Sequence, residues 1–227
     1  LAVGGESILC PLVVSGLAQA KALSRRNDQP EQACRPFDAA RDGFVIGEGG
    51  GALLLETEAH ARARGAKIYA VLAGYANTSD AYHVTAPHPE GAGAAACMRR
   101  ALARAHMQPH DIGYINAHGT STPLGDKAET LAVKAVFGAR DCAPPISSTK
   151  SMTGHLMGAG GLTEAIACIL AIREGILPPT LHLDTPDPDC DLDYIPHTAR
   201  RASITSAMSN SLGFGGQNSS LIFTKYA

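Results

Sequence analysis

Short β-prone runs alternate with segments of helical periodicity along most of this chain, and this alternation restricts the fold more than any other feature. Helices that follow strands in this way can cover a sheet, so the pattern predicts an α/β sheet with helices on both faces. Strands are predicted at residues 1–3, 52–55, 68–76, 111–116, 146–148, 203–208 and 219–224, and helices at 11–23, 57–64, 91–105, 122–137 and 162–173.

Particular segments sharpen this prediction. The run 68–76 is apolar and β-prone, so we expect a strand that is buried on both faces. Thr122 offers a hydroxyl N-cap and Pro123 suits the first helical position. The glycine run 47–51 fits either a phosphate cradle or close backbone packing; because no Gly-Lys-Ser/Thr follows it, we favour close packing. The irregular loop 77–89 is of a length that is usually functional or mobile.

The composition indicates a globular protein. Of its 227 residues, 45% are hydrophobic and 18% charged, and the net charge of -2 without long Lys/Arg runs argues against a nucleic-acid surface. No apolar run is long enough to span a bilayer. Six cysteines without a CxxC pair predict free thiols in a reducing compartment, either the cytoplasm or an organellar matrix of a mitochondrion or plastid. The chain opens in mid-strand at Leu1 without Met, so we interpret it as a piece of a longer protein.

Four alternating aspartates lie in the proline-rich segment 178–196. A calcium loop would need a glycine that this segment lacks, and Pro188 also breaks the pattern. We therefore do not predict a metal site at Asp187, Asp189, Asp191 and Asp193.

Two polar turns place histidines after predicted strands. His118 follows one strand, and Lys150 and His155 follow the next within Ser147–Gly161. Both turns can meet at the carboxyl edge of one sheet, where α/β folds bind ligands. Two imidazole N–H groups on one oxygen would stabilise an enolate that develops on a thioester carbonyl. The alternative interpretation is two loop histidines hydrogen-bonded to backbone.

The turn Gly213–Gly216 has two interpretations of its own. It can present a backbone N–H to an oxyanion, with Phe214 as a movable apolar gate, or it can be a tight β-hairpin.

The polar turns and the glycine-rich turn contain no nucleophile. Cys10 lies nearest to a strand-to-helix turn, but nothing beside it resembles an activated thiol.

Several long motifs resemble the β-ketoacyl-acyl-carrier-protein synthases, particularly the elongating type II enzymes (KAS II). These motifs are NAHGTSTP (116–123), SSTKSMTGH (147–155), NSLGFGGQN (210–218), RPFDAARDGFVIGE (35–48) and SDAYHVTAPHPE (79–90). The resemblance implies a thiolase-like layered αβαβα fold, in which residues 1–66 end the first half and 67–227 form the second. It also implies a homodimer, an acyl-carrier-protein partner and decarboxylating condensation of malonyl-carrier protein with an acyl group held on an enzyme cysteine.

The resemblance also implies roles for individual residues. His118 and His155 would hold the malonyl thioester carbonyl, Lys150 would polarise them, and the Phe214 N–H would bind the acyl oxyanion. No cofactor is required, although a monovalent cation (Na or K) occurs in some relatives. The remaining assignments are substrate binding by Thr120, Thr122, Thr85, Gly215 and Gly216, a carrier-protein contact at Lys21, and cation ligation by Asn116, Glu164, Ser209 and Asn210.

The chain departs from the family pattern at single residues and in extent. Gln217 stands where Thr is usual, Gly50 where Ala is common, and Leu212 where Phe is frequent. The family's cysteine-bearing segment would precede Leu1, so we expect the nucleophile upstream. Two alternatives stay open: a non-catalytic structural or assembly subunit derived from a ketoacyl synthase, and a polyketide-type condensing domain. A degradative thiolase fits less well, because that chemistry uses a second cysteine as its base.

Overall fold

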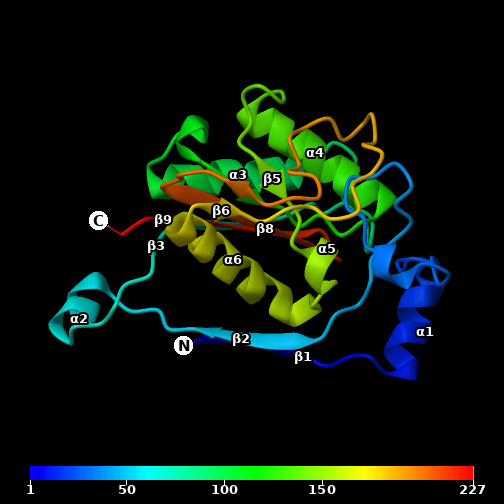
Figure 1. Ribbon diagram of the computed structural model, residues 1–227, viewed down its shortest axis with the longest axis horizontal. Helices are drawn as coiled ribbons and strands as arrows, with labels where there is room; N and C mark the ends of the chain where they lie inside the picture. Colours follow the sequence, from blue (N-terminus) through cyan, green and yellow to red (C-terminus); the bar gives the residue numbers. More distant parts are fainter. Residues whose placement is uncertain (227) are drawn as a thin grey trace.

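The computed structural model describes residues 1–226, in which helices and strands alternate (Figure 1). The strands are β1 (Ala2–Glu6), β2 (Gly49–Leu53), β3 (Val71–Ser79), β4 (Ile115–Asn116), β5 (Ile146–Ser147), β6 (Ile176–Leu177), β7 (Arg200–Arg201), β8 (Ser206–Gly213) and β9 (Gln217–Thr224). The helices are α1 (Pro11–Gln19), α2 (Glu58–Ala63), α3 (Ala92–Ala105), α4 (Pro123–Phe137), α5 (Lys150–Thr153) and α6 (Gly160–Glu174), with 3-10 turns η1 (Pro30–Gln32), η2 (Pro109–Asp111) and η3 (Met157–Ala159). The predicted α/β class is confirmed.

A five-stranded mixed sheet forms the centre of the fold. Its strand order is β3-β9-β8-β4-β5, with β4 parallel to both β5 and β8. Asn116, the last residue of β4, is in register with Ser147 on β5 and Ser209 on β8. The chain segments that leave β4 and β5 therefore start side by side at one edge of the sheet.

Helices cover both faces of this sheet. Helices α3 and α4 lie on one face, and α6 lies on the other (Figure 1). The apolar side of α3 was predicted correctly, since Ala94, Ala95, Met98, Ala101 and Leu102 are all buried. On the opposite face, Cys168 of α6 packs with Tyr114 and Phe223. Two separate apolar clusters thus hold the sheet from its two sides.

The antiparallel pair β1–β2 lies beyond α6, so the layers run helix, sheet, helix, sheet (Figure 1). Glycines allow this approach. A Cβ on Gly47 would lie 2.3 Å from the Thr153 carbonyl oxygen, and one on Gly4 would lie 2.8 Å from that of Gly158. Close packing is therefore the correct interpretation of the glycine run, which also forms part of β2.

Several sequence predictions about elements are wrong. The strand predicted at residues 111–116 is only Ile115–Asn116, because the 3-10 turn η2 extends to Asp111. Strand β3 is an edge strand that pairs only with β9, and Leu72 and Tyr75 on it are exposed. An apolar run does not distinguish an edge strand from a central one, because a helix on one side can bury part of it. The Thr122 hydroxyl does not cap α4, because it bonds to the Thr120 hydroxyl instead.

Two further expectations concern the chain as a whole. Among residues 1–226, no helix combines the length and the apolar character that a membrane span requires. The predicted boundary between residues 66 and 67 falls between α2 and β3 and stays a prediction.

Candidate active site

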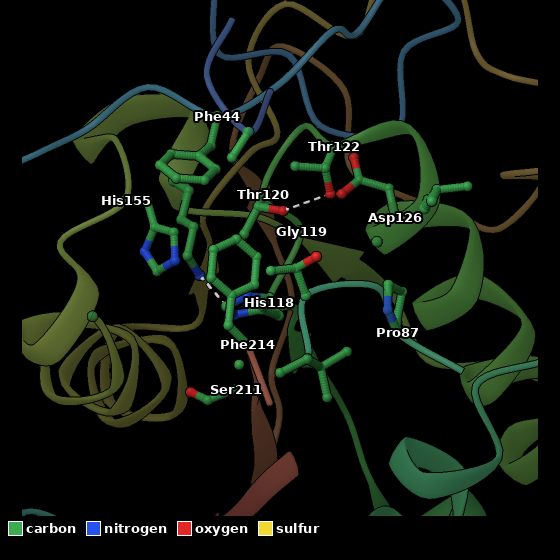
Figure 2. Close-up of a pocket in the computed structure, with 18 of the residues that line it drawn as sticks. Phe44, Pro87, His118, Gly119, Thr120, Thr122, Asp126, His155, Ser211 and Phe214 are labelled. Atoms are coloured by element: carbon green, nitrogen blue, oxygen red, sulfur yellow. Dashed lines mark hydrogen bonds between the residues drawn. The ribbon is translucent and has the colours of Figure 1, made fainter. Parts of the chain in front are cut away.

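A cavity of about 600 Å³ opens where the chain leaves β4 and β5 (Figure 2). His118, Lys150 and His155 line it together, so the structure brings the predicted turns to one place. Phe214 reaches the same cavity from the β8–β9 turn, and Thr85 reaches it from the loop before α3. The cavity thus collects residues from these four segments, and Lys21 and Phe44 line it from two further ones.

His118 lies two residues beyond β4 and is held by its backbone. Its N–H donates to Glu129 Oε1 at 2.9 Å, and the Gly119 N–H donates to Oε2 of the same carboxylate at 2.8 Å. The Lys150 Nζ lies 3.4 Å from His118 Nδ1. Because an ammonium can only donate, Nδ1 must accept, and the ring proton resides on Nε2.

His155 reaches the cavity from the segment after α5. Its own N–H donates to the Val45 carbonyl at 2.7 Å, and its Nδ1 accepts the Met157 N–H at 3.2 Å. Phe44 packs edge-on against the ring at 5.3 Å between centroids. His155 therefore also carries its proton on Nε2, since its Nδ1 is occupied as an acceptor.

The two imidazole rings meet at 5.3 Å between centroids, with an angle of 85° between their planes. Burial, with the Lys150 ammonium adding to it, lowers the pKa of His155 from 6.5 to about 3. The same causes, followed by the charge of His155, lower the pKa of His118 well below its ordinary value. Both rings are therefore neutral near pH 7, and each has one N–H to donate.

Lys150 is buried and forms an ion pair with the equally buried Glu164. Burial raises the pKa of the Glu164 carboxyl, against the opposing effect of Lys150. The Ser211 hydroxyl also donates to Glu164, at 3.5 Å. The buried Glu164 carboxyl group thus has Lys150 as its charged partner.

The predicted cation ligands are buried but have protein partners. Asn116 Oδ1 accepts from the Thr149 hydroxyl at 3.4 Å, and Asn210 Oδ1 accepts from the Ser220 hydroxyl at 2.8 Å. Ser209 pairs beside Asn116 in the sheet. These oxygens are of the kind that hard cations bind, and those of Asn116, Asn210 and Glu164 already have protein donors. The cation therefore stays a prediction.

Of the predicted substrate-binding residues, Thr85, Thr120 and Thr122 line the cavity, whereas Gly215 and Gly216 do not. The Thr120 and Thr122 hydroxyls are 3.0 Å apart, and both residues line the cavity with Thr85 and Lys21. Phe214 is 53% exposed and lies on a hairpin turn, so the hairpin interpretation is correct and the turn also borders the cavity (Figure 2). Gly215 and Gly216 follow it with positive φ values of 81° and 73°.

Two carboxylates of α4 were not predicted as parts of the site. Glu129 holds the backbone of His118 and Gly119, and Asp126 accepts the N–H groups of Ser121 and Phe37. Burial raises the pKa of Glu129 to about 7 and that of Asp126 to about 6. Their spacing in the sequence could have indicated this role. Residues at positions i and i+3 lie on the same side of a helix, and this side of α4 is buried.

No cysteine is among the cavity-lining residues that the structure describes. Cys34 lies behind Lys150, with its Sγ 3.0 Å from the Lys150 carbonyl oxygen. Burial raises the pKa of this thiol to about 12, so it is protonated near pH 7. The described chain therefore offers a cavity that can stabilise an oxyanion but no thiolate beside it.

A layered α/β fold with two neutral imidazoles at the carboxyl edge of its sheet defines a protein that can stabilise a developing oxyanion. Residues 1–61 match the family model described as the N-terminal domain of β-ketoacyl synthase, and residues 69–184 match its C-terminal domain. The chain belongs to the β-ketoacyl synthase family.

Individual relatives agree with this assignment. The chain is 53% identical over 223 residues to 3-oxoacyl-[acyl-carrier-protein] synthase 2 of Synechocystis sp., an alignment that covers 98% of the chain and 54% of the relative. It is 50% identical over 228 residues to the protein of the same name from Vibrio harveyi, covering 100% and 55%. The chain thus spans about half the length of the curated relatives it matches.

Solved structures share the fold. A β-ketoacyl synthase from Burkholderia phymatum matches with a TM-score of 0.94 at 44% identity, covering 100% of this chain and 54% of that one. A type II polyketide ketosynthase, solved in complex with its acyl-carrier protein, matches with a TM-score of 0.94 at 43% identity, covering 98% and 55%. The expected thiolase-like layered fold is confirmed.

Proposed function

We propose that this chain forms the malonyl-activating half of a 3-oxoacyl-[acyl-carrier-protein] synthase that elongates fatty acids. The observation that carries the proposal is the pair of imidazoles in one cavity. Each Nδ1 is engaged as an acceptor, by Lys150 for His118 and by the Met157 N–H for His155. Each ring therefore keeps an Nε2–H for a substrate oxygen.

The proposed chemistry begins with the malonyl thioester. Its carbonyl oxygen accepts the Nε2–H groups of His118 and His155, the bond to the carboxylate breaks, and CO₂ leaves. The electron pair of that bond forms an enolate, whose negative oxygen the two N–H groups stabilise. The enolate carbon then attacks an acyl thioester on an enzyme cysteine, forming a carbon–carbon bond and releasing the thiolate. We assign that cysteine to the part of the full-length synthases that this chain does not span.

The other site residues support this scheme. Burial and, secondarily, the Lys150 ammonium keep both rings neutral, and Lys150 also holds the His118 tautomer through its position at Nδ1. The Phe214 N–H is assigned to the acyl oxyanion, with Gly215 and Gly216 giving the turn its conformation. The hydroxyls of Thr120, Thr122 and Thr85 are assigned to the pantetheine arm because they line the same cavity.

The proposed partner is an acyl carrier protein, with Lys21 at the cavity mouth as a contact to its acidic surface. A ketosynthase neighbour was solved in complex with such a carrier, which supports this assignment. We further propose a homodimer, acting in the cytoplasm or an organellar matrix. We also propose that a sodium or potassium ion can bind at Asn116, Glu164, Ser209 and Asn210. The proposed reaction does not require this ion.

The proposal is tested by product analysis with a full-length synthase that carries this chain as its C-terminal half. Acyl- and malonyl-carrier protein should yield a 3-oxoacyl-carrier protein two carbons longer than the primer, detected by mass spectrometry. His155→Ala should abolish the product, whereas His110→Ala, which alters an exposed histidine outside the cavity, should not. Elongation at the normal rate by His155→Ala would refute the assigned role.

A second candidate is condensation in polyketide synthesis, favoured by the 43% identity to the polyketide ketosynthase. The two candidates share their chemistry and differ in the fate of the product. A fatty-acid enzyme should add one unit to a saturated primer and stop, whereas a polyketide enzyme should extend an unreduced 3-oxoacyl chain repeatedly. The product mass separates them.

A further inference from the structure

A second cavity, of about 440 Å³, lies at the end of α6 that points away from α5 (Figure 1). Three segments of the sequence border it: the end of α6 with Gly175, residues 201–205 between β7 and β8, and Lys225 after β9. None of these lining residues also lines the candidate active site. We call this space the α6-end cavity, and the proposed reaction makes no use of it.

The charged residues of the α6-end cavity are mostly cations. Arg173, Arg201 and Lys225 line it from the three segments, and within residues 1–226 the acidic lining residue is Glu174, which is 57% exposed and lies 3.8 Å from the Arg173 guanidinium. No carboxylate within the same residues forms an ion pair with Arg201 or Lys225. An arginine in the last turn of a helix can simply complement the helix dipole, but Arg201 and Lys225 belong to other elements. The cavity therefore has a local excess of positive charge in a chain whose net charge is -2.

An aromatic ring beside the cavity supports Arg173. The guanidinium carbon lies 4.7 Å from the centre of the Tyr69 ring, and the Lys67 Nζ lies 5.3 Å from the same centre. A guanidinium that contacts a ring through its face keeps the N–H groups at its edge for other acceptors. The Arg173 side chain is 30% exposed, so these N–H groups can meet a ligand.

The segment between β7 and β8 adds hydrogen-bond donors. The backbone N–H groups of Ser203, Ile204 and Thr205, which all line the α6-end cavity, donate to no acceptor within residues 1–226. Ser203 and Thr205 are exposed, so their hydroxyls are also available. Side-chain cations together with backbone N–H groups of an irregular segment are the donors that bind phosphate groups in proteins. Ile172 and Ile204 give the same cavity an apolar part.

We propose that the α6-end cavity binds a phosphorylated small molecule, with Arg173, Arg201 and Lys225 as its charged contacts and the N–H groups of residues 203–205 as further donors. A phosphate group carries up to about two negative charges and three acceptor oxygens near pH 7, which matches this set of donors. The cavity is larger than a phosphate ion needs and lies in the size range of small-molecule sites. We therefore assign the apolar part to the remainder of the ligand. This inference does not depend on the proposed function.

The first test is isothermal titration calorimetry on a full-length synthase that carries this chain, at pH 7.5 and about 0.15 M salt, where weak surface attraction is screened. The probes are ADP, inorganic pyrophosphate and adenosine. ADP should bind with a Kd below about 1 mM, and adenosine, which lacks phosphate, should bind at least about tenfold more weakly. Pyrophosphate that binds as tightly as ADP would show that the site takes free phosphates, and the assignment of the apolar part would be wrong. Adenosine binding as tightly as ADP, or no binding of either phosphate compound, would overturn the proposal.

The second test locates the binding. The double variant Arg201→Gln/Lys225→Gln should weaken ADP binding at least about tenfold, because two charge-assisted contacts are lost. Arg201→Lys, which keeps the charge, should weaken it less than the double variant does. The matched control is Arg100→Gln, at an exposed arginine of α3 outside both cavities, which should stay within about twofold.

Two further readouts separate binding from folding and from the reaction. The melting temperature without ligand and the rate of condensation should be the same in all variants, because these side chains lie outside the candidate active site. An unchanged Kd for ADP in the folded double variant would show that ADP binds elsewhere and would overturn the proposal. If the unmodified synthase does not condense substrates, the proposed function fails while the binding result stands.

Discussion

At the residue scale, the main feature of the site is that its neighbours fix the chemical form of both histidines. Lys150 can only donate to His118 Nδ1, and the Met157 N–H can only donate to His155 Nδ1. Burial keeps both rings neutral. In water an imidazole can take either tautomer, but here each ring is restricted to the one with its N–H on Nε2. The two N–H groups therefore need not change tautomer or orientation when an oxyanion develops.

The lowered pKa of His155 predicts how stability depends on pH. An unfolded histidine binds a proton near pH 6.5, whereas the folded one does so only near pH 3. Between these values the unfolded state holds more protons, so this contribution to stability is present above pH 6.5 and is lost as the pH falls. On going from pH 7.5 to pH 5, the unmodified chain should lose about 2 kcal/mol more of its free energy of unfolding than His155→Gln. Urea denaturation at both pH values measures this difference; equal losses would contradict it.

A second residue-scale prediction concerns Glu129, which accepts the N–H groups of His118 and Gly119 with its two oxygens. In Glu129→Gln one oxygen becomes an NH₂ group, which faces a backbone donor and leaves it unsatisfied. The free energy of unfolding should fall by about 1–3 kcal/mol, and the His118 amide should exchange faster. Glu31→Gln, at an exposed glutamate, should change neither quantity. A Glu129→Gln variant as stable as the original would show that the carboxylate does not hold this turn.

At the element scale, the segment between β6 and β7 is attached to the body of the protein by ion pairs. Each of the four alternating aspartates that failed the calcium pattern has its own cationic partner: Asp187 with Arg41, Asp189 with Lys127, Asp191 with Lys134, and Asp193 with Arg200. No group of three or more His, Cys, Asp or Glu residues within 1–226 could hold a metal ion. These aspartates therefore attach the β6–β7 segment to neighbouring parts of the protein through ion pairs.

The ion pairs of this segment should differ in strength because they differ in burial. Arg41 is 4% exposed beside Asp187, whereas Lys127 and Asp189 are 46% and 58% exposed. Asp187→Asn should lower the free energy of unfolding by about 1–2 kcal/mol, since it removes one of the two carboxylates that pair with the buried Arg41 guanidinium and leaves only Asp126, at 3.6 Å. Asp189→Asn should cost less than about 0.5 kcal/mol and become neutral in high salt. Equal effects in urea denaturation would show that burial does not decide the strength of these pairs.

The elements also show what the sequence can and cannot predict. The meeting of His118 and His155 was predictable because the carboxyl ends of adjacent parallel strands share an edge. The edge position of β3 was not, because an apolar run does not identify the neighbours of a strand. Glu129 was missed for a related reason: a charged residue is expected in solvent unless its distant partners are known, and here these are backbone N–H groups ten and eleven positions away.

At the scale of the whole molecule, the last layer of the fold is open on one side. Helix α1 buries none of its residues, and Leu12 on it is 82% exposed. The β1–β2 pair packs on α6 with one face only. The chain spans about half the length of its relatives.

The half of the reaction assigned to this chain can be measured apart from condensation. In the proposed scheme, release of CO₂ from malonyl-carrier protein uses the two imidazoles and forms no bond to a cysteine. The most direct measurement is therefore the rate of CO₂ release by a full-length synthase that carries this chain, compared with His118→Ala, His155→Ala and the control His110→Ala. Each cavity variant should fall by at least about 100-fold, as on removal of an oxyanion donor, while the control stays within about twofold. Release at the original rate from both cavity variants would contradict the central claim that these neutral imidazoles stabilise the enolate.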